Sequence, residues 1–311
     1  MSILNNIVCA EAGGNTGIAD CSLTLKNVLG GFLVPNSFEL TAAQLASKES
    51  VMAALEDAIN NDIPSQRIYP LPQVVGVTDN TEDPVFETLG YGAQVPVRDG
   101  KYNFLYRYTR GGNCVSNQLS KFNNGNYRFL GLDAAGILFG TKVGTSLKGI
   151  PLDFFYNRPF RFSDGTAGTT FAYQIVYDPV YINSGLAFVQ MDVSSVLALS
   201  GLQNIVLSLA IPRATNVITV KATTGCAGTD LYDEYSTELA AVGNFKVTEA
   251  GKDITITSVA VNANLKALSI TLDATDPDYA AGGPFVVSLA PVSVLSAAGV
   301  VGFEGIPLTV A

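Results

Sequence analysis

Alternating apolar and polar positions predict β-strands through most of this chain, most clearly in residues 101–109. Tyr102, Phe104, Tyr106 and Tyr108 occupy every second position there, and Lys101, Asn103, Leu105 and Arg107 fill the others. A repeat of two is the signature of a β-strand, and aromatic side chains pack well on a pleated surface. We expect this strand to lie in the main sheet with its aromatic face in the core.

One segment, from about Thr41 to Asn60, has the period of a helix. Leu45, Met52, Leu55 and Ile59 recur at helical spacing, and Thr41 and Gln44 form the two halves of a capping box. Ser47 offers a break that would divide the segment into two shorter helices, and the sequence 60–64 ends it at Pro64, which cannot continue a helix.

Further strands follow at regular intervals. Val85–Val97 and Lys101–Thr109 are expected to form two strands joined by a turn at residues 98–100, because Asp-Gly is typical of tight hairpin turns. The other strands of the N-terminal part are expected near 127–132, 136–141, 152–156, 170–177, 186–192 and 204–210. In the C-terminal part they are expected near 217–222, 245–248, 254–261, 267–272, 285–289 and 302–310.

These patterns predict a mainly β protein with two domains. Residues 1–210 form an α+β assembly domain, a β-sandwich or barrel with one main helix. Within it, residues 1–37 are rich in Gly, Asn and Ser and are expected to be an arm that orders only on a neighbouring subunit. Residues 211–311 have short, regularly spaced strands and are expected to form an immunoglobulin-like sandwich.

Composition adds a statement about the surface. Hydrophobic residues make up 48% of the chain and charged residues only 14%, against about a quarter in typical soluble proteins. Such a chain either hides much of its outer surface against partners or has a large β core beneath a Ser/Thr/Asn surface. We favour the first interpretation.

Charge is distributed in three blocks. Residues 1–97 hold 3 Lys/Arg against 11 Asp/Glu, residues 98–161 hold 10 against 3, and residues 162–311 hold 5 against 13. The net charge of −9 disfavours nucleic acid as a partner, because the whole molecule repels phosphate. Blocks of opposite sign suit contacts between copies of one chain, although basic residues scattered over a folded surface would give the same counts.

Cysteines and termini bear on localisation. Cys9, Cys21, Cys114 and Cys226 form no CxxC pair, so a zinc site is not indicated. Free buried thiols are favoured over a Cys9–Cys21 disulfide, which makes folding in a cytoplasm the default. The N-terminus lacks the basic start and long apolar core of a signal peptide, and no apolar run is long enough to span a bilayer.

Candidate chemistry is sparse, and we predict no catalytic, cofactor or metal site. The chain has no histidine, which excludes Ser-His-Asp and Cys-His catalysis. Asp230, Asp233, Glu234 and Glu238 are close in sequence, and a solvated loop explains them better than a pair of catalytic carboxylates. Residues 273–278 (DATDPD) contain three Asp; a turn between strands explains them better than a calcium site. The strand with Lys101 and Arg107 could stack bases or sugars, but a core role for its rings is favoured.

The C-terminal sequence resembles bacterial Ig-like repeats, which are common in surface proteins and on phage virion proteins. The segments that carry the resemblance are residues 245–251, 254–261, 268–272 and the pair Ala298-Gly299 before a final strand. The N-terminal two-thirds, with its arm, single helix and β block, resembles phage tail-tube proteins, although it is longer than many tube domains. The resemblance implies a sheet-based ring, rings stacked into a hollow tube, and an Ig-like domain on the outside.

We therefore predict a non-enzymatic virion protein, made in a bacterial cytoplasm, whose partners are copies of itself and other virion proteins. A tail-tube subunit is the leading hypothesis. Another virion component, such as a capsid decoration or neck protein, is the nearest alternative. A cell-surface adhesion or carbohydrate-binding module is the alternative from a different class. Removal of residues 1–37 is expected to leave a folded subunit that assembles poorly.

Overall fold

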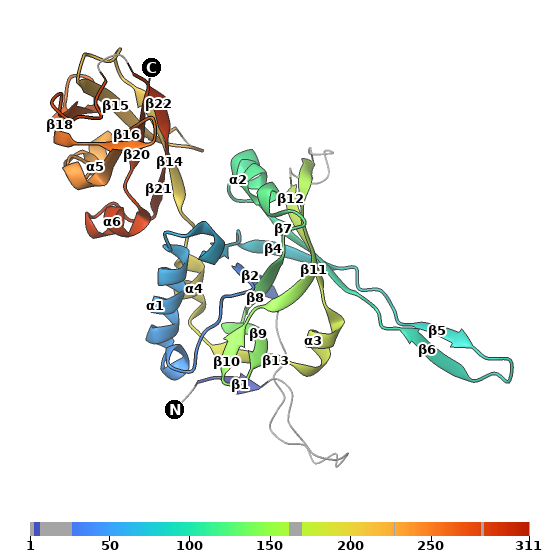
Figure 1. Ribbon diagram of the computed structural model, residues 1–311. Coiled ribbons are helices and arrows are strands. Elements are labelled where there is room, and N and C mark those ends of the chain that lie inside the picture. The colour runs from blue at the N-terminus through green and yellow to red at the C-terminus, as the bar shows by residue number, and fades with distance from the viewer. Residues whose placement is uncertain (1–2, 7–26, 162–169, 227, 281–282, 311) are drawn as a thin grey trace. The chain divides into compact units, whose positions relative to one another are not determined.

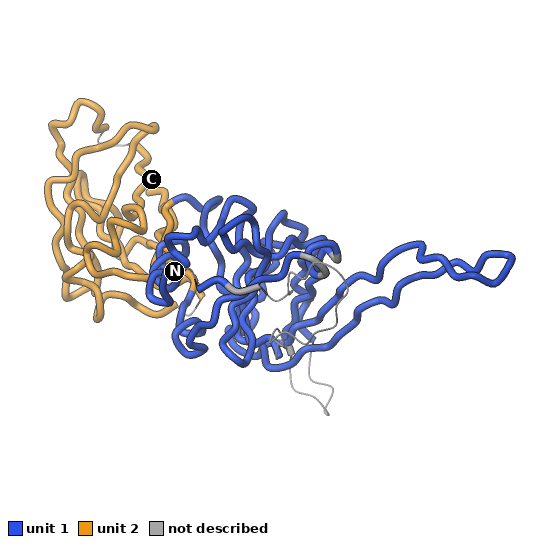
Figure 2. The backbone as a smooth tube through the Cα atoms, turned by 90° about the horizontal axis from the view of Figure 1, so that it is seen from below, with its two compact units in different colours: residues 1–59, 63–200 blue, residues 60–62, 201–311 orange. Residues whose placement is uncertain are grey.

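The chain is mainly β, as its sequence predicts, with several antiparallel sheets and few short helices (Figure 1). The computed structural model describes residues 3–6, 27–161, 170–226, 228–280 and 283–310. It has two compact units: unit 1 comprises residues 1–59 and 63–200, and unit 2 comprises residues 60–62 and 201–311 (Figure 2).

Unit 1 is built on one large sheet. Within the described residues its main strand order is β1-β13-β9-β8-β11-β12-β7-β4, with β2 and β3 attached through β8, and β10 through β9. Its strands are β1 (Asn5–Asn6), β2 (Val28–Pro35), β3 (Tyr69–Pro70), β4 (Val74–Asp79), β7 (Tyr102–Tyr108), β8 (Tyr127–Asp133), β9 (Ile137–Val143), β10 (Ser146–Lys148), β11 (Ile150–Arg161), β12 (Thr170–Tyr177) and β13 (Leu186–Gln190). A separate two-stranded sheet consists of β5 (Val85–Thr88) and β6 (Gln94–Arg98).

The helices of unit 1 are short apart from α1. They are α1 (Lys48–Ile59), α2 (Gly112–Leu119), α3 (Pro179–Ser184) and α4 (Val193–Ala198), with 3-10 turns at Gln44–Ala46, Pro64–Gln66 and Ser120–Phe122. The expected capping box is present: Thr41 N donates to Gln44 Oε1 at 2.8 Å, and Gln44 N donates to Thr41 Oγ1 at 3.5 Å. The helical segment divides at Ser47, whose Oγ accepts from Ser50 N at 3.2 Å. Both sequence predictions are therefore confirmed.

The N-terminal arm differs from the prediction in its last third. Val28–Pro35 is strand β2, paired with β8 along its length, and its side chains alternate between two cores: Phe32 and Val34 face one, Leu33 the other. A Cβ at Gly31 would lie 2.7 Å from the Phe129 ring, so this glycine allows close packing inside the sheet and does not mark a loop. Removing residues 1–37 would take a buried strand from the sheet, so a folded product is no longer expected. Residues 7–26 lie outside the described residues.

The aromatic face of β7 lies in the core, as predicted. Tyr106 and Tyr108 are buried, and Tyr102 and Phe104 pack against the same cluster. Tyr173 and Tyr177 of β12 lie opposite Tyr106 and Tyr102 in the ladder. The Tyr106 and Tyr177 hydroxyls are hydrogen-bonded at 2.8 Å, and Tyr108 Oη donates to Asn157 Oδ1 at 3.0 Å. The buried rings thus keep most of their polar ends satisfied, as burial requires.

Unit 2 is a sandwich of two sheets that share one core. The larger sheet has the order β18-β19-β15-β14-β21 and the smaller β17-β16-β20-β22; β14 and β21 are parallel, and the other pairs are antiparallel. The strands are β14 (Gln203–Leu209), β15 (Val217–Thr224), β16 (Phe245–Glu249), β17 (Lys252–Ile254), β18 (Ile256–Asn262), β19 (Ala267–Leu272), β20 (Phe285–Leu289), β21 (Phe303–Ile306) and β22 (Leu308–Val310), with helices α5 (Tyr232–Leu239) and α6 (Val292–Ala297) and a 3-10 turn at Val242–Asn244.

Two expectations about the chain's organisation change. The segment expected to close the first domain at 204–210 is β14, which pairs with β15 and β21 of unit 2, so the division lies after Ser200 and not after residue 210. Cys114 and Cys226 are each disulfide-bonded, so the expectation of free thiols is wrong for these two residues. Disulfides persist in oxidising environments, which include virion and cell surfaces.

Candidate functional site: the β5–β6 arm and its root

Residues 80–100 form a hairpin arm that extends from the sheet of unit 1 in both views (Figures 1 and 2). Phe86 pairs with Pro96 and Glu87 with Val95, and a register shift follows Val85. The arm reverses at its tip, where Leu89 N donates to Ala93 O at 2.8 Å and Gly92 N to Leu89 O at 2.7 Å. Gly92 has a φ of 84°, a left-handed conformation that glycine adopts without strain.

The arm corrects the predicted hairpin. The sequence predicts that 85–97 is one strand joined to β7 by a turn at Arg98–Gly100. Instead, the reversal lies at residues 89–93, β5 pairs with β6, and β7 pairs with β4 and β12. The Asp-Gly signal misled because Gly100 serves a different purpose. A Cβ at this position would overlap the carbonyl oxygen of Glu82 and lie 2.8 Å from its carbonyl carbon, so glycine permits two backbones to pass closely.

The arm concentrates exposed apolar side chains. Nineteen large hydrophobic residues are exposed among the described residues, and five of them lie between positions 85 and 97. Phe86 is 54% exposed and Tyr91 is 81% exposed; the other three are Val85, Val95 and Val97. Every residue of β5 and β6 is exposed, and none belongs to a hydrophobic core of the described structure. An isolated two-stranded hairpin is marginally stable in water, so a partner surface that covers its apolar side chains would stabilise this arm.

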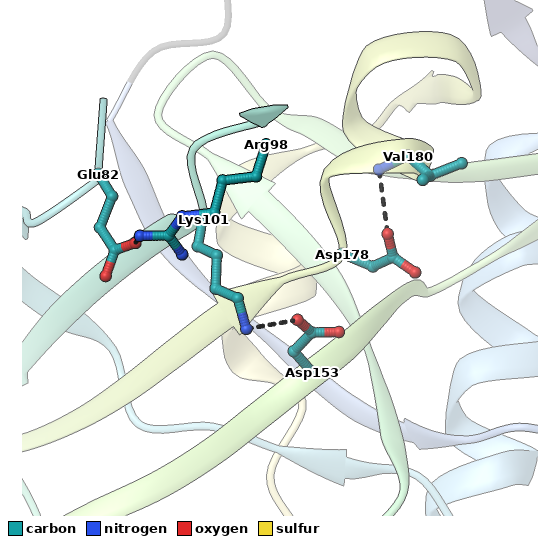
Figure 3. A network of polar contacts seen from close by, with 6 residues as sticks. All are labelled: Glu82, Arg98, Lys101, Asp153, Asp178 and Val180. Atoms are coloured by element: carbon teal, nitrogen blue, oxygen red, sulfur yellow. Dashed lines mark hydrogen bonds and ion pairs between the residues drawn. The ribbon is translucent and has the colours of Figure 1, made fainter. Parts of the chain in front are cut away.

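The root of the arm is held by backbone bonds and two ion pairs (Figure 3). Asn80 N donates to Asn103 O at 2.8 Å and Glu82 N to Lys101 O at 3.1 Å, which extends the β4–β7 ladder into the arm. Arg98 and Glu82 approach to 3.4 Å, and Lys101 and Asp153 to 3.5 Å. All four side chains are more than a third exposed, and exposed pairs contribute about 0–1 kcal/mol, so the backbone bonds define the geometry.

Next to this root, Asp178 Oδ1 accepts from Val180 N at 3.0 Å and so caps the N-terminus of α3 (Figure 3). Asp178 N in turn donates to Pro151 O of β11 at 3.3 Å, which fixes the start of α3 to the sheet. The polar groups of this region therefore serve structural bonds.

The strands beside the root present a second surface feature, on the face of the sheet opposite the tyrosine core. Alternation along β7, β11 and β12 brings Arg107, Ala172 and Arg158 into one row, and Leu105, Gln174 and Tyr156 into the next. We call the patch formed by Leu105, Arg107, Phe154, Tyr156, Arg158 and Gln174 the arginine face. Arg158 Nη2 donates to Gln174 Oε1 at 2.8 Å, and Gln174 Nε2 donates to Asn103 Oδ1 at 2.8 Å. A hydrogen-bonded polar row thus orients Arg158 on this face.

The open edge of the large sheet adds a third feature. β4 is the last strand in the sheet order, and within the described part of the chain no strand pairs with its outer side. Val75 is 62% exposed and Val77 is 39% exposed on this strand. Unpaired backbone groups along an exposed edge are a template for strands of another chain.

The carboxylates singled out from the sequence have structural roles or lie in solvent. Residues 232–239 form helix α5 and not the expected loop, and Asp233 pairs there with Lys266 at 2.8 Å. In the 273–278 segment, the Thr275 hydroxyl and amide hold the pKa of Asp273 below its usual value. The amides of Asp278 and Thr255 do the same for the pKa of Asp276. These bonds build the expected turn, and no group of three or more candidate metal ligands occurs among the described residues.

Comparison with known proteins leaves the family open. No family model matches this chain, and no curated protein or solved structure matches it significantly. None of the helices in the described part of the chain combines the length and apolar character that crossing a membrane requires.

The arm is the feature that sequence reasoning missed. The signal was present: Gly90-Tyr91-Gly92 separates two short alternating runs, and Pro84 and Pro96 disfavour a place inside a central sheet. Pattern alone assigned those runs to one strand because apolar residues continue through both of them.

Proposed function

We propose that this protein is a non-enzymatic structural subunit that assembles with copies of itself, as a phage tail-tube protein does, with unit 2 as an Ig-like appendage on the outside of the assembly. The carrying observation is the β5–β6 arm, which exposes five large apolar side chains and lies outside the hydrophobic cores that the described residues form. The open edge of β4 and the blocks of opposite charge support the same conclusion.

The energetics favour a partner for the arm. Fully burying a side chain such as Phe or Val contributes about 1.5–3 kcal/mol relative to leaving it in water. The arm's five apolar side chains are 40–81% exposed, so covering them regains a large part of that energy. Few residues of the folded chain would have to reorganise to obtain it, because the arm is already paired and closed at its tip.

The test is the oligomeric state of the full chain and of an armless variant. In the variant, residues 83–100 are replaced by Asn-Gly, which favours a two-residue hairpin between Glu82 and Lys101, residues already joined by a backbone bond. We expect the full chain to form rings or tubes in negative-stain microscopy and the armless variant to stay monomeric. Its free energy of unfolding should change by less than about 1 kcal/mol, because the arm belongs to no core.

A matched pair of surface variants separates the arm from general surface hydrophobicity. Phe86→Ser with Tyr91→Ser removes apolar area from the arm, and Val143→Ser removes it from an exposed position on β9. Only the arm variant should lose assembly. Strictly monomeric wild-type protein at high concentration, or an armless variant that assembles normally, refutes the proposal.

A surface adhesion module remains the second candidate, on one observation. Cys114 and Cys226 are disulfide-bonded, as is common in proteins that act outside the cell. Glycan-array binding by a monomeric wild-type protein would favour this function over assembly.

A further inference from the structure

We propose that the arginine face of one copy receives the β5–β6 arm of a second copy, an inference that rests on the proposed function. The arm and the face are different surfaces of unit 1, so a contact in which each copy gives its arm to one neighbour and receives the arm of another is heterologous. A heterologous contact generates rings where its rotation closes and open filaments where it does not. Such a contact gives self-assembly without requiring any symmetric patch.

The charges of the two surfaces are complementary. The arm holds Glu82, Asp83, Glu87 and Asp99 against a single basic residue, Arg98, which pairs with Glu82 of the same arm. Asp83, Glu87 and Asp99 are therefore left with uncompensated charge among the described residues.

The receiving strands have the opposite sign. β7, β11 and β12 contain three arginines, at 107, 158 and 161, and one acid, Asp153, which pairs with Lys101. Arg107 is exposed and makes no ion pair in the described structure, and Arg158 is hydrogen-bonded to the neutral side chain of Gln174. Complementary charges of this kind fix register and suppress wrong docking.

The two surfaces also match in apolar character. Between the arginines the face presents Leu105 and the stacked rings of Phe154 and Tyr156, whose centroids are 5.8 Å apart. These three side chains are half-buried, and none packs in a hydrophobic core of the described residues. The arm supplies Phe86 and Tyr91, and aromatic residues beside arginine are the composition that protein interfaces favour.

Charge reversal tests this pairing. Glu87→Arg makes position 87 of the arm basic, like Arg107 on the face, and Arg107→Glu makes position 107 of the face acidic, like Glu87 on the arm. We expect each variant alone to assemble at least about tenfold more weakly than the wild type, because like charges then meet across the contact. A mixture of the two should assemble, because position 87 of each variant can then meet position 107 of opposite sign on the other variant. Lys142→Glu, at an exposed basic position on β9, is the control and should assemble as the wild type does.

The outcomes distinguish this inference from the proposed function. If the armless variant fails to assemble while Arg107→Glu assembles normally, self-assembly through the arm stands and the arginine face is refuted as its receiver. If both single variants fail but their mixture also fails, the pairing is equally refuted. If the wild type never assembles, both proposals fail.

Photo-crosslinking gives an independent readout that does not depend on a variant losing assembly. With p-benzoylphenylalanine in place of Tyr91, we expect crosslinks to peptides containing residues 103–107, 154–158 or 172–176. Mixing isotopically light and heavy chains identifies the crosslinks that join two copies. Crosslinks confined to other segments, or found only within one chain, would overturn the proposal.

Discussion

Gly100→Ala is the substitution that should separate the arm's geometry from the rest of the fold. Gly100 lies where the strand that leaves the arm passes the strand that enters it. An alanine Cβ there would lie 2.8 Å from the Glu82 carbonyl carbon and 3.2 Å from the Asp83 carbonyl carbon. The carbonyl oxygen of Glu82 is nearer still and would overlap the added Cβ. Optimal contacts between carbon atoms are about 3.5–4.0 Å, so the two backbones must separate by at least about 1 Å.

That separation has a calculable cost. The nearest cross-strand bond, from Glu82 N to Lys101 O, is 3.1 Å long, and a displacement of about 1 Å takes it beyond hydrogen-bonding distance. The next bond, from Asn80 N to Asn103 O, shares the same backbones. At about 0.5–1.5 kcal/mol for each bond, the root of the arm loses about 2 kcal/mol of local stability. A difference of about 2 kcal/mol corresponds to roughly a 30-fold change in an opening equilibrium.

Native-state amide hydrogen exchange measures this local opening directly. We expect the amides of Asn80 and Glu82 to exchange roughly 30-fold faster in Gly100→Ala, with β8 and β9 unchanged. Gly90→Ala is the matched control, since it lies in the same arm and a Cβ there has no neighbour within 4 Å. Equal exchange at the root in the two variants would show that close backbone approach at Gly100 does not set the arm's geometry.

Three further predictions concern the tyrosine core. The Tyr173 hydroxyl is buried without a hydrogen-bond partner in the described structure, so Tyr173→Phe should raise the free energy of unfolding by about 1 kcal/mol. Tyr106→Phe should lower it by a similar amount, because it removes the bonding partner of the Tyr177 hydroxyl; denaturant titration that finds both variants equally destabilised would contradict this assignment. Burial raises the pKa of Tyr106, Tyr173 and Tyr177 above the ordinary value of 10.0, because the folded core disfavours the charged phenolate. The contribution of these tyrosines to the free energy of unfolding is therefore complete below pH 10 and is lost as pH rises towards the folded-state pKa. Between about pH 10 and 12 the free energy of unfolding should fall by up to about 1.4 kcal/mol per pH unit for each tyrosine. A free energy of unfolding that does not change over this pH range would refute the prediction.

Local patterns were sufficient for the elements whose side chains face one core. The β7 aromatics alternate because one side of that strand packs against Tyr173 and Phe129, and alternation is visible in any single sequence. The capping box at Thr41 and Gln44 is likewise local, since both partners lie within one turn. In unit 2, the strands at 267–272 and 285–289 coincide with their predicted bounds.

Patterns failed where a residue's role depends on distant neighbours. Strand β2 is buried on both sides, so its sequence has no alternation, and its two glycines suggested a loop; the Phe129 ring that requires Gly31 is almost a hundred residues away. The Arg98–Gly100 segment suggested a turn because Asp-Gly is common in turns, whereas the structure uses that glycine for backbone approach to Glu82. Both glycines are evident in the sequence, but the role of each depends on the residue that it packs against, which is distant in the sequence.

The arm also changes the interpretation of the chain's low charge content. A large β core accounts for much of the hydrophobic composition, because the tyrosine and helix-covered cores of unit 1 and the sandwich core of unit 2 are extensive. It does not account for Phe86, Tyr91 and three valines on a hairpin that belongs to none of the cores in the described part of the chain. On a monomer those side chains would favour non-specific aggregation, because exposed strands with apolar side chains pair with other chains. Acidic residues are interspersed among them, and the arginines of β7 and β11 are a surface of unit 1 whose charge and apolar side chains complement the arm.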